Sequence, residues 1–166
     1  FNIGHTSTGI SLAAGLAKAR NLAGGTENVV VVIGDGAMSG GEALEGLNVI
    51  GEMGTNFIIV FNDNDQSISE NHGGMYAKFK EMRETNGQAE DNLFRALGLR
   101  YRYVADGNDA EEMIRVLSEE KDTTSPVVIH IHTIKGKGLS FAEADPEGWH
   151  RHAPFHVETG ICLLYT

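Results

Sequence analysis

The sequence has little of several residue types that mark particular classes of protein. It contains one cysteine, Cys162, which excludes an internal disulfide and a zinc site built on several cysteines, and favours a reducing, cytoplasmic compartment. Lys and Arg number 13 against 23 Asp and Glu, and this net charge of −10 disfavours nonspecific binding to nucleic acid or an anionic membrane. No apolar run approaches the roughly 20 residues of a membrane-spanning helix. We therefore expect neither nucleic acid nor a membrane as partner.

The composition that remains is that of one globular domain. The chain has 166 residues, of which 41% are hydrophobic and 22% charged. Its 21 glycines exceed the usual share, so some of them should lie where backbone approaches a ligand. Because the chain starts at Phe1 instead of a methionine and ends in an apolar stretch, we expect a piece of a longer protein.

Strand-like and helix-like segments alternate along the chain. Continuous β-branched and aromatic runs predict strands buried on both faces of a parallel sheet, at 29–33, 57–61, 101–104 and 127–132. Apolar residues at helical spacing predict helices at 11–22, 42–53, 92–99 and 110–120, the last starting with Asp109 and Glu112 as a capping box. The alternation predicts an α/β fold, a doubly wound, mostly parallel sheet with helices on both faces.

Ligands bind such sheets at the carboxyl ends of the strands, which here are the loops 34–41, 62–69 and 133–139. The first loop is rich in glycine and leads into a helix, so its backbone N–H groups can point at a phosphate. Its spacing fits neither a Walker A nor a dinucleotide-binding pattern. Asp35 stands in this loop, and a bare carboxylate repels phosphate. Either a divalent cation lies between the two, or Asp35 only caps the turn or the next helix.

The second loop, Asn62-Asp63-Asn64-Asp65-Gln66-Ser67, follows the next buried strand. One βαβ unit separates the two loops, so we expect them side by side at one edge of the sheet. Mg²⁺ takes oxygen ligands, and the Asp35 carboxylate, an Asn side-chain oxygen and a backbone carbonyl could supply them. The alternative is a plain polar turn, which Asn and Asp also favour.

Together these motifs resemble a known family. Gly34-Asp35-Gly36 followed at this distance by Asn62-Asp63-Asn64 resembles the thiamine-diphosphate motif of thiamine enzymes, in particular the transketolase family. The surrounding residues are similar to those of the 1-deoxy-D-xylulose-5-phosphate synthases of that family. The similarity extends from residue 4 to about residue 160 and includes these segments: 4–8, 32–41, 62–71, 135–138, 149–150 and 154–160.

The resemblance implies a cofactor and its contacts. Gly4, His5 and Thr6 match the stretch that contacts the diphosphate of thiamine diphosphate, and Gly36 and Ala37 match backbone contacts to the same group. The resemblance also implies that residues 1–160 form a diphosphate-binding domain, incomplete at its N-terminus. Residues 161–166 would start a linker or a truncated tail.

The metal and catalytic residues follow from the same resemblance. Asp35 and Asn64 match two ligands of Mg²⁺, and Asn64 also touches the cofactor. Gln66 matches a residue that offers its main-chain carbonyl to the metal. His150 matches a histidine that faces the substrates and assists proton transfer.

The implied reaction joins pyruvate to glyceraldehyde 3-phosphate, with loss of CO₂, to give 1-deoxy-D-xylulose 5-phosphate for isoprenoid, thiamine and pyridoxal synthesis. The thiazolium of the cofactor acts as the electron sink. The resemblance implies a homodimer and a pyrimidine-binding domain that this chain lacks, so the chain alone should be inactive. It implies a cytoplasmic enzyme, or a plastid one if an unseen leader precedes it.

Some features leave alternatives open. A transketolase that transfers two-carbon ketol units shares the cofactor site, and a noncatalytic phosphate-binding domain of the same fold is a further reading. Leu139 stands where the synthases of this family have a tyrosine near the cofactor. His130 and His132 alternate on a predicted strand, where packing or hydrogen bonding is their expected role. A zinc site at His150, His152 and His156 is disfavoured because no fourth ligand accompanies them.

Overall fold

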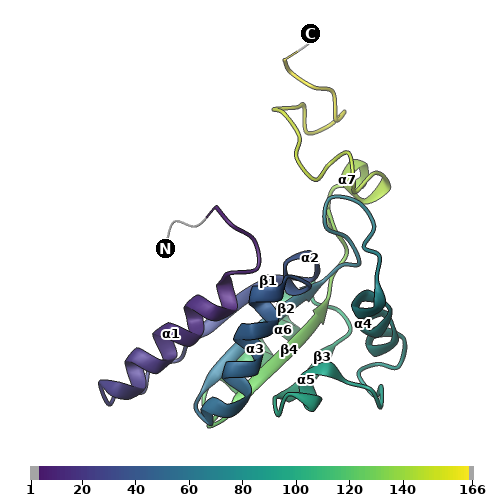
Figure 1. Ribbon diagram of the computed structural model, residues 1–166. Helices are drawn as coiled ribbons and strands as arrows, with labels where there is room; N and C mark the ends of the chain where they lie inside the picture. The colour runs from purple at the N-terminus through teal and green to yellow at the C-terminus, as the bar shows by residue number, and fades with distance from the viewer. Residues whose placement is uncertain (1–3, 165–166) are drawn as a thin grey trace.

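The structure is a computed structural model that describes residues 4–164. Within this range four strands form one parallel sheet in the order β1-β2-β4-β3 (Figure 1). The strands are β1 (Val30–Gly34), β2 (Phe57–Asp63), β3 (Arg100–Val104) and β4 (Pro126–His132). The helices are α1 (Gly9–Leu22), α2 (Asp35–Met38), α3 (Gly41–Met53), α4 (Gly74–Glu84), α5 (Leu93–Ala96), α6 (Ala110–Glu120) and α7 (Ser140–Ala144).

Helices cover both faces of the sheet, which confirms the predicted doubly wound α/β fold. On one face α1, α3, α4 and α5 pack on the aromatic and aliphatic side chains of β1 and β2, including Phe57, Ile59 and Phe61. On the other face α6 packs through Val116 on Val60, Ile129 and other residues of β2, β3 and β4. Helix α6 leaves β1 uncovered on this side, where Val32 is 70% exposed.

Several predicted elements differ from the structure in extent. The loop predicted at 34–41 contains the short helix α2, and the polar segment 74–84, for which no helix was predicted, forms α4. The helix predicted at 92–99 is wrong beyond Ala96, because Gly98 takes a positive φ of 81° and turns the chain toward β3. The capping box is half formed: Asp109 accepts from the backbone of Glu112, but the Glu112 carboxylate pairs with Arg115.

The last part of the chain leaves the body of the domain. After α7, residues 145–164 form turns without a helix or strand of their own and extend away from the sheet (Figure 1). The expected boundary at residue 160 falls inside this segment, which an isolated bridge between Phe155 and Cys162 folds back on itself. Residues 1–3 of the expected domain and 165–166 of the expected tail lie outside the described residues.

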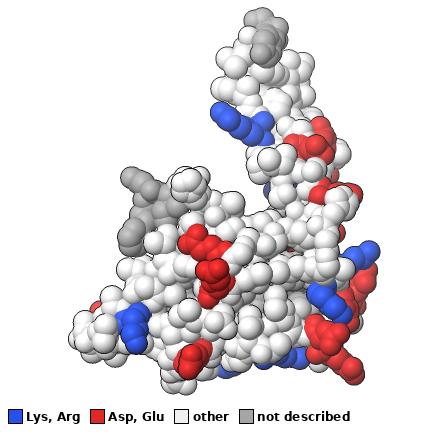
Figure 2. Space-filling view, viewed as in Figure 1, with Lys and Arg blue, Asp and Glu red and all other residues white. Residues whose placement is uncertain are grey.

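Among the described residues, no helix has both the length and the apolar character that crossing a membrane requires. Figure 2 shows the charged side chains of one face in small separate groups, with no continuous basic surface. This pattern agrees with the excess of acidic over basic residues.

Arg20 on α1 ties the amino-terminal end of the sheet together. Its side chain is buried, and its guanidinium donates to the Glu27 carbonyl at 2.6 Å and to the Asn56 side chain at 2.5 Å. It also donates to the Thr55 hydroxyl at 2.7 Å. Arg20 thereby joins the end of α1 to the segments that enter β1 and β2, using neutral acceptors in place of a carboxylate.

We predict that Arg20→Met lowers the free energy of unfolding by about 2–4 kcal/mol, because it leaves several acceptors without their charged donor. Urea-induced unfolding followed by circular dichroism measures the change. Lys18→Met, an exposed position on the same helix, is the matched control and should change stability by less than about 0.5 kcal/mol. Equal effects of the two substitutions would contradict the prediction.

Candidate functional site

The parallel register of β1 and β2 brings the first two predicted loops together. Gly34, the last residue of β1, pairs with Asn62 near the end of β2, so both chains leave the sheet at the same level. Just past the second loop, Asn71 Nδ2 also donates to Asp35 Oδ2 in the first loop, at 2.9 Å. The expectation that they lie side by side is confirmed.

The turn after β2 is organised by its own side chains. Asp63 Oδ1 accepts from the backbone N–H of Asp65 at 3.1 Å, and Asn64 Oδ1 accepts from that of Gln66 at 3.2 Å. The same Gln66 N–H acts on the Asp35 carboxylate, whose pKa it lowers in part. Asp35 and Asn64 therefore both approach one backbone group. Whether they are metal ligands stays a prediction.

Asp35 is a buried acid without a cationic partner among the described residues. It is 2% exposed, and burial raises its pKa to about 6, with a further upward contribution from nearby Asp63. Its hydrogen-bond donors are uncharged: Gly36 N at 2.9 Å and the Asn71 amide. Asp35 is the first residue of α2 rather than its N-cap, which is Gly34, and neither α2 nor α3 has a side-chain cap hydrogen bond.

Asp63 has the opposite environment. It is fully buried, but its carboxylate receives Arg83 Nη1 at 2.5 Å and His130 Nε2 at 2.8 Å. Burial alone would raise its pKa, and these two partners outweigh burial and lower it. Of two neighbouring acids, one is thus neutralised by protein groups while the other is left able to take an external cation.

Two close approaches show how tightly the site's backbone segments fit. A Cβ on Gly36 would lie 2.6 Å from Ser67 Cβ, so glycine is required where α2 meets the second turn. A Cβ on Gly40 would lie 2.0 Å from Ser7 Oγ, which places the turn before α1 against the first loop. Ser7 itself has a positive φ of 71°. The exposed residues Gly4, His5 and Thr6 come just before Ser7, and their contact with a diphosphate stays a prediction.

The third loop also joins this edge of the sheet. Lys135 Nζ donates to the carbonyls of Ser67 at 2.7 Å and Ile68 at 3.3 Å, so it holds the second turn. Thr133 donates to Asn62 Oδ1 at 2.6 Å. A shallow cavity of 360 Å³ opens here, and its lining includes Asn64 and Lys137.

The donor set can be tested against a cation. No group of three or more His, Cys, Asp or Glu side chains able to hold a metal occurs within residues 4–164. A site built from Asp35, Asn64 and the Gln66 backbone is not a group of this kind, because only Asp35 contributes an acidic side chain. The other two ligands would be the side-chain amide oxygen of Asn64 and the main-chain carbonyl oxygen of Gln66. The side-chain oxygen Gln66 Oε1 is buried without a hydrogen-bond partner in this turn. Oxygen donors of this kind fit a hard divalent cation.

The histidines separate into buried and exposed ones. His130 is fully buried and hydrogen-bonded, which confirms its expected role. His150 lies exposed on the segment after α7, and the structure shows no side-chain contact between it and the two turns. Beside it, Trp149 stacks on His152 at 4.2 Å between ring centroids. The catalytic role of His150 therefore stays a prediction.

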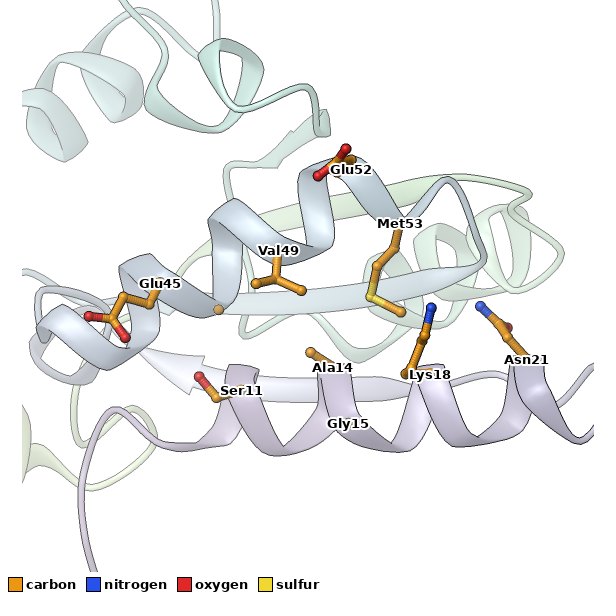
Figure 3. Close-up of a pocket in the computed structure, with 10 residues that line it drawn as sticks. Ser11, Ala14, Gly15, Lys18, Asn21, Glu45, Val49, Glu52 and Met53 are labelled. Atoms are coloured by element: carbon orange, nitrogen blue, oxygen red, sulfur yellow. The ribbon is translucent and has the colours of Figure 1, made fainter.

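A larger groove of 710 Å³ lies elsewhere, along α1 and α3 (Figure 3). Its floor is made of small and aliphatic residues such as Ala14 and Val49, with Lys18 and Glu45 also lining it. It lies on the helical layer instead of the carboxyl edge of the sheet. Its aliphatic floor lacks the converging polar groups of the two turns.

Comparison with known proteins identifies the family. A family profile described as 1-deoxy-D-xylulose-5-phosphate synthase matches residues 1–90 and 80–133. The chain belongs to this family. The synthase of Listeria monocytogenes is 42% identical over 96% of this chain and 27% of its own length, and that of Clostridium kluyveri is 37% identical over 96% and 31%. The present chain thus spans about 30% of the length of these two synthases.

Solved structures agree on the fold. A transketolase from Campylobacter jejuni matches 84% of this synthase-family chain and 21% of its own, with a TM-score of 0.62 and 24% identity. A transketolase from Leishmania mexicana matches 76% and 18%, with a TM-score of 0.51 and 25% identity. Both likenesses support the doubly wound fold.

Sequence reasoning missed four residues that shape the site of this synthase-family chain: Asp63, Asn71, Arg83 and Lys135 as a hydrogen-bond donor to the second turn. Asp63 is part of the recognised motif, but the neighbouring residues in the sequence do not indicate that its side chain is buried. Arg83 lies on α4, which was not predicted. The one available signal was His130, a polar residue inside an apolar strand, which requires a buried partner.

We predict that Asp35→Asn stabilises the metal-free protein at neutral pH. The raised pKa of Asp35 means that the folded state favours the protonated carboxyl group. The stabilisation that the protonated group provides is complete below pH 4 and is lost as the pH rises through about 6, because the buried group then ionises. At pH 7.5 the free energy of unfolding of the variant should be about 2 kcal/mol higher than that of the wild type, and at pH 4 the two should differ little. Urea unfolding at both pH values tests this, with Asp122→Asn as the exposed control.

Gly36→Ala should separate the two turns, because its methyl group meets Ser67. We expect a loss of about 1–3 kcal/mol of stability, measured by thermal or urea unfolding. Gly41→Ala is the matched control, since nothing lies within 4 Å of a Cβ there. The double variant Gly36→Ala/Ser67→Gly should recover most of the loss. Failure of Ser67→Gly to compensate would show that the clash is not the cause.

Proposed function

We propose that this chain is the diphosphate- and cation-binding part of a thiamine-diphosphate-dependent enzyme that condenses pyruvate with glyceraldehyde 3-phosphate. The products are CO₂ and 1-deoxy-D-xylulose 5-phosphate, a precursor for isoprenoids, thiamine and pyridoxal. Membership of the synthase family supports the reaction class. The observation that carries the proposal is that Asp35 and the Asn64 turn meet at one edge of the sheet, where the Gln66 backbone N–H reaches the Asp35 carboxylate.

The cation is proposed to be Mg²⁺, held by the Asp35 carboxylate, the Asn64 side-chain oxygen and the Gln66 main-chain carbonyl. Three features support this assignment. Asp35 is a buried acid with only neutral donors around it, so a cation would compensate the cost of its charge. Asp63, beside it, already has cationic and neutral donors. The turn also contains the orphaned oxygen of Gln66.

The diphosphate is proposed to lie between the cation and the backbone of Gly36 and Ala37, with Gly4, His5 and Thr6 on its other side. The contact of Ser7 with Gly40 supports this arrangement, because it seats the first segment against the second. Bound there, thiamine diphosphate supplies the electron sink that decarboxylation requires. The chain's own groups hold and orient it, and His150 is proposed to move protons at the substrates.

Other parts of the proposal concern the whole protein. Since the curated relatives are more than three times as long as this chain, we propose that a pyrimidine-binding domain completes the site. A homodimer and a cytoplasmic location stay predictions.

The proposal is tested on the complete protein that contains this chain. Mg²⁺ and thiamine diphosphate together should raise the melting temperature of the wild type by several degrees, whereas Asp35→Asn should show little or no rise. The wild type should release CO₂ from pyruvate in a reaction that depends on glyceraldehyde 3-phosphate, and Asp35→Asn should lose most of this activity.

The outcomes separate the alternatives. Ketol transfer between sugar phosphates without CO₂ release would indicate a transketolase. Failure to bind thiamine diphosphate at millimolar Mg²⁺ would contradict the proposal and favour a noncatalytic domain. Asp122→Asn, far more exposed than Asp35, should behave as the wild type in both assays.

A further inference from the structure

A buried polar network lies directly beneath the turn that carries Asn64 and Gln66. Its centre is the carboxylate of Asp63, the last residue of β2. His130 on β4 contacts Asp63 Oδ2 through Nε2 at 2.8 Å, and Tyr101 on β3 contacts His130 Nδ1 through its hydroxyl at 2.7 Å. Asp63 and His130 are both fully buried. The network runs across three neighbouring strands on the face of the sheet where His130 also packs on Phe61 and on Phe79 of α4.

The direction of each hydrogen bond follows from chemistry. An ionised carboxylate only accepts, so Nε2–H of His130 donates to Asp63. The histidine is neutral, because burial lowers its pKa more than Asp63 raises it. Its Nδ1 therefore accepts, and the Tyr101 hydroxyl donates to it. The chain of donors runs one way, from Tyr101 through His130 to Asp63.

Arg83 on α4 closes the network from the other side. It contacts Asp63 Oδ2 at 2.5 Å through Nη1 and Asp65 Oδ1 at 2.9 Å through Nη2. The other oxygen of Asp63 accepts from the Asp65 backbone N–H. Asp63 and Asp65 flank Asn64, so both neighbours of Asn64 are held by the one guanidinium of Arg83.

We propose that His130 is a positioning residue that, through Asp63, sets the geometry of the Asn64–Gln66 turn and hence the affinity of the site for a divalent cation. The inference rests on the proposed function, because it assumes that the turn holds such a cation. His130 itself touches neither the cation nor the substrates. It fixes Asp63 Oδ2 in the interior, so that Asp63 Oδ1 points to the turn and accepts from the Asp65 backbone N–H.

The alternative is that the network only stabilises the fold. Melting temperature alone does not separate the two roles, since loss of a buried hydrogen bond lowers it in either case. Cation affinity, measured well below the melting temperature of each variant, does separate them.

The experiment uses the complete protein and measures Mg²⁺ binding by isothermal titration calorimetry in the presence of thiamine diphosphate. His130→Phe keeps the ring but removes the donor, and it should raise the dissociation constant for Mg²⁺ about tenfold. The kcat at saturating Mg²⁺ should stay within about twofold of the wild type. His130→Gln, whose amide can donate to Asp63, should restore most of the affinity.

Tyrosine variants give a milder, matched comparison. Tyr101→Phe removes the hydroxyl that orients His130 and should weaken Mg²⁺ binding by about threefold. Tyr103→Phe is the control: its ring also packs on His130, at 5.3 Å, but both nitrogens of His130 already have other partners. If His130→Phe does not fold, this pair decides the question. Equal affinities of the two tyrosine variants overturn the inference.

The two proposals fail in different ways. Mg²⁺ binding by the wild type with unaltered affinity in His130→Phe, despite a lower melting temperature, overturns the positioning role alone. No Mg²⁺ binding by the wild type overturns the proposed function, and this inference with it.

Discussion

The parallel pairing of β1 with β2 is the constraint on which the site depends. Because Gly34 is aligned with Asn62, the two strands end at the same level, and each polar turn begins where the other does. A one-residue slip would reverse which side chains of β2 face the two cores. Phe57, Ile59 and Phe61 on one face and Ile58 and Val60 on the other prevent that slip, so hydrophobic packing fixes the polar site.

The two buried carboxylates at this edge, Asp35 and Asp63, have opposite environments. Asp63 is surrounded by donors and satisfied, whereas Asp35 is buried with its charge uncompensated. An arrangement of this kind costs stability, and such costs are typical of functional sites. The fold can carry it because the aromatic cluster around Phe61, Phe79 and Phe94 packs close to the network.

Other features of the molecule lie away from the carboxyl edge of the sheet. At the opposite end of the sheet, Arg20 joins the segments that enter β1 and β2. The segment after α7 extends away from the sheet, and β1 has one uncovered apolar face. Both features fit a chain that spans about 30% of the length of its curated relatives.

The sequence by itself determined the fold class, the four strands and the two turns, because long apolar runs and their spacing depend on local pattern and burial alone. It also pointed to Asp35 and Asn64 through a recognisable motif. Only the tertiary structure decided that Asp63 turns inward to His130, that Arg83 reaches it from an unpredicted helix, and that Asp35 has no cationic partner among the described residues. These contacts join residues 20 to 67 positions apart, and side-chain partners at such separations follow from packing, which no local pattern encodes.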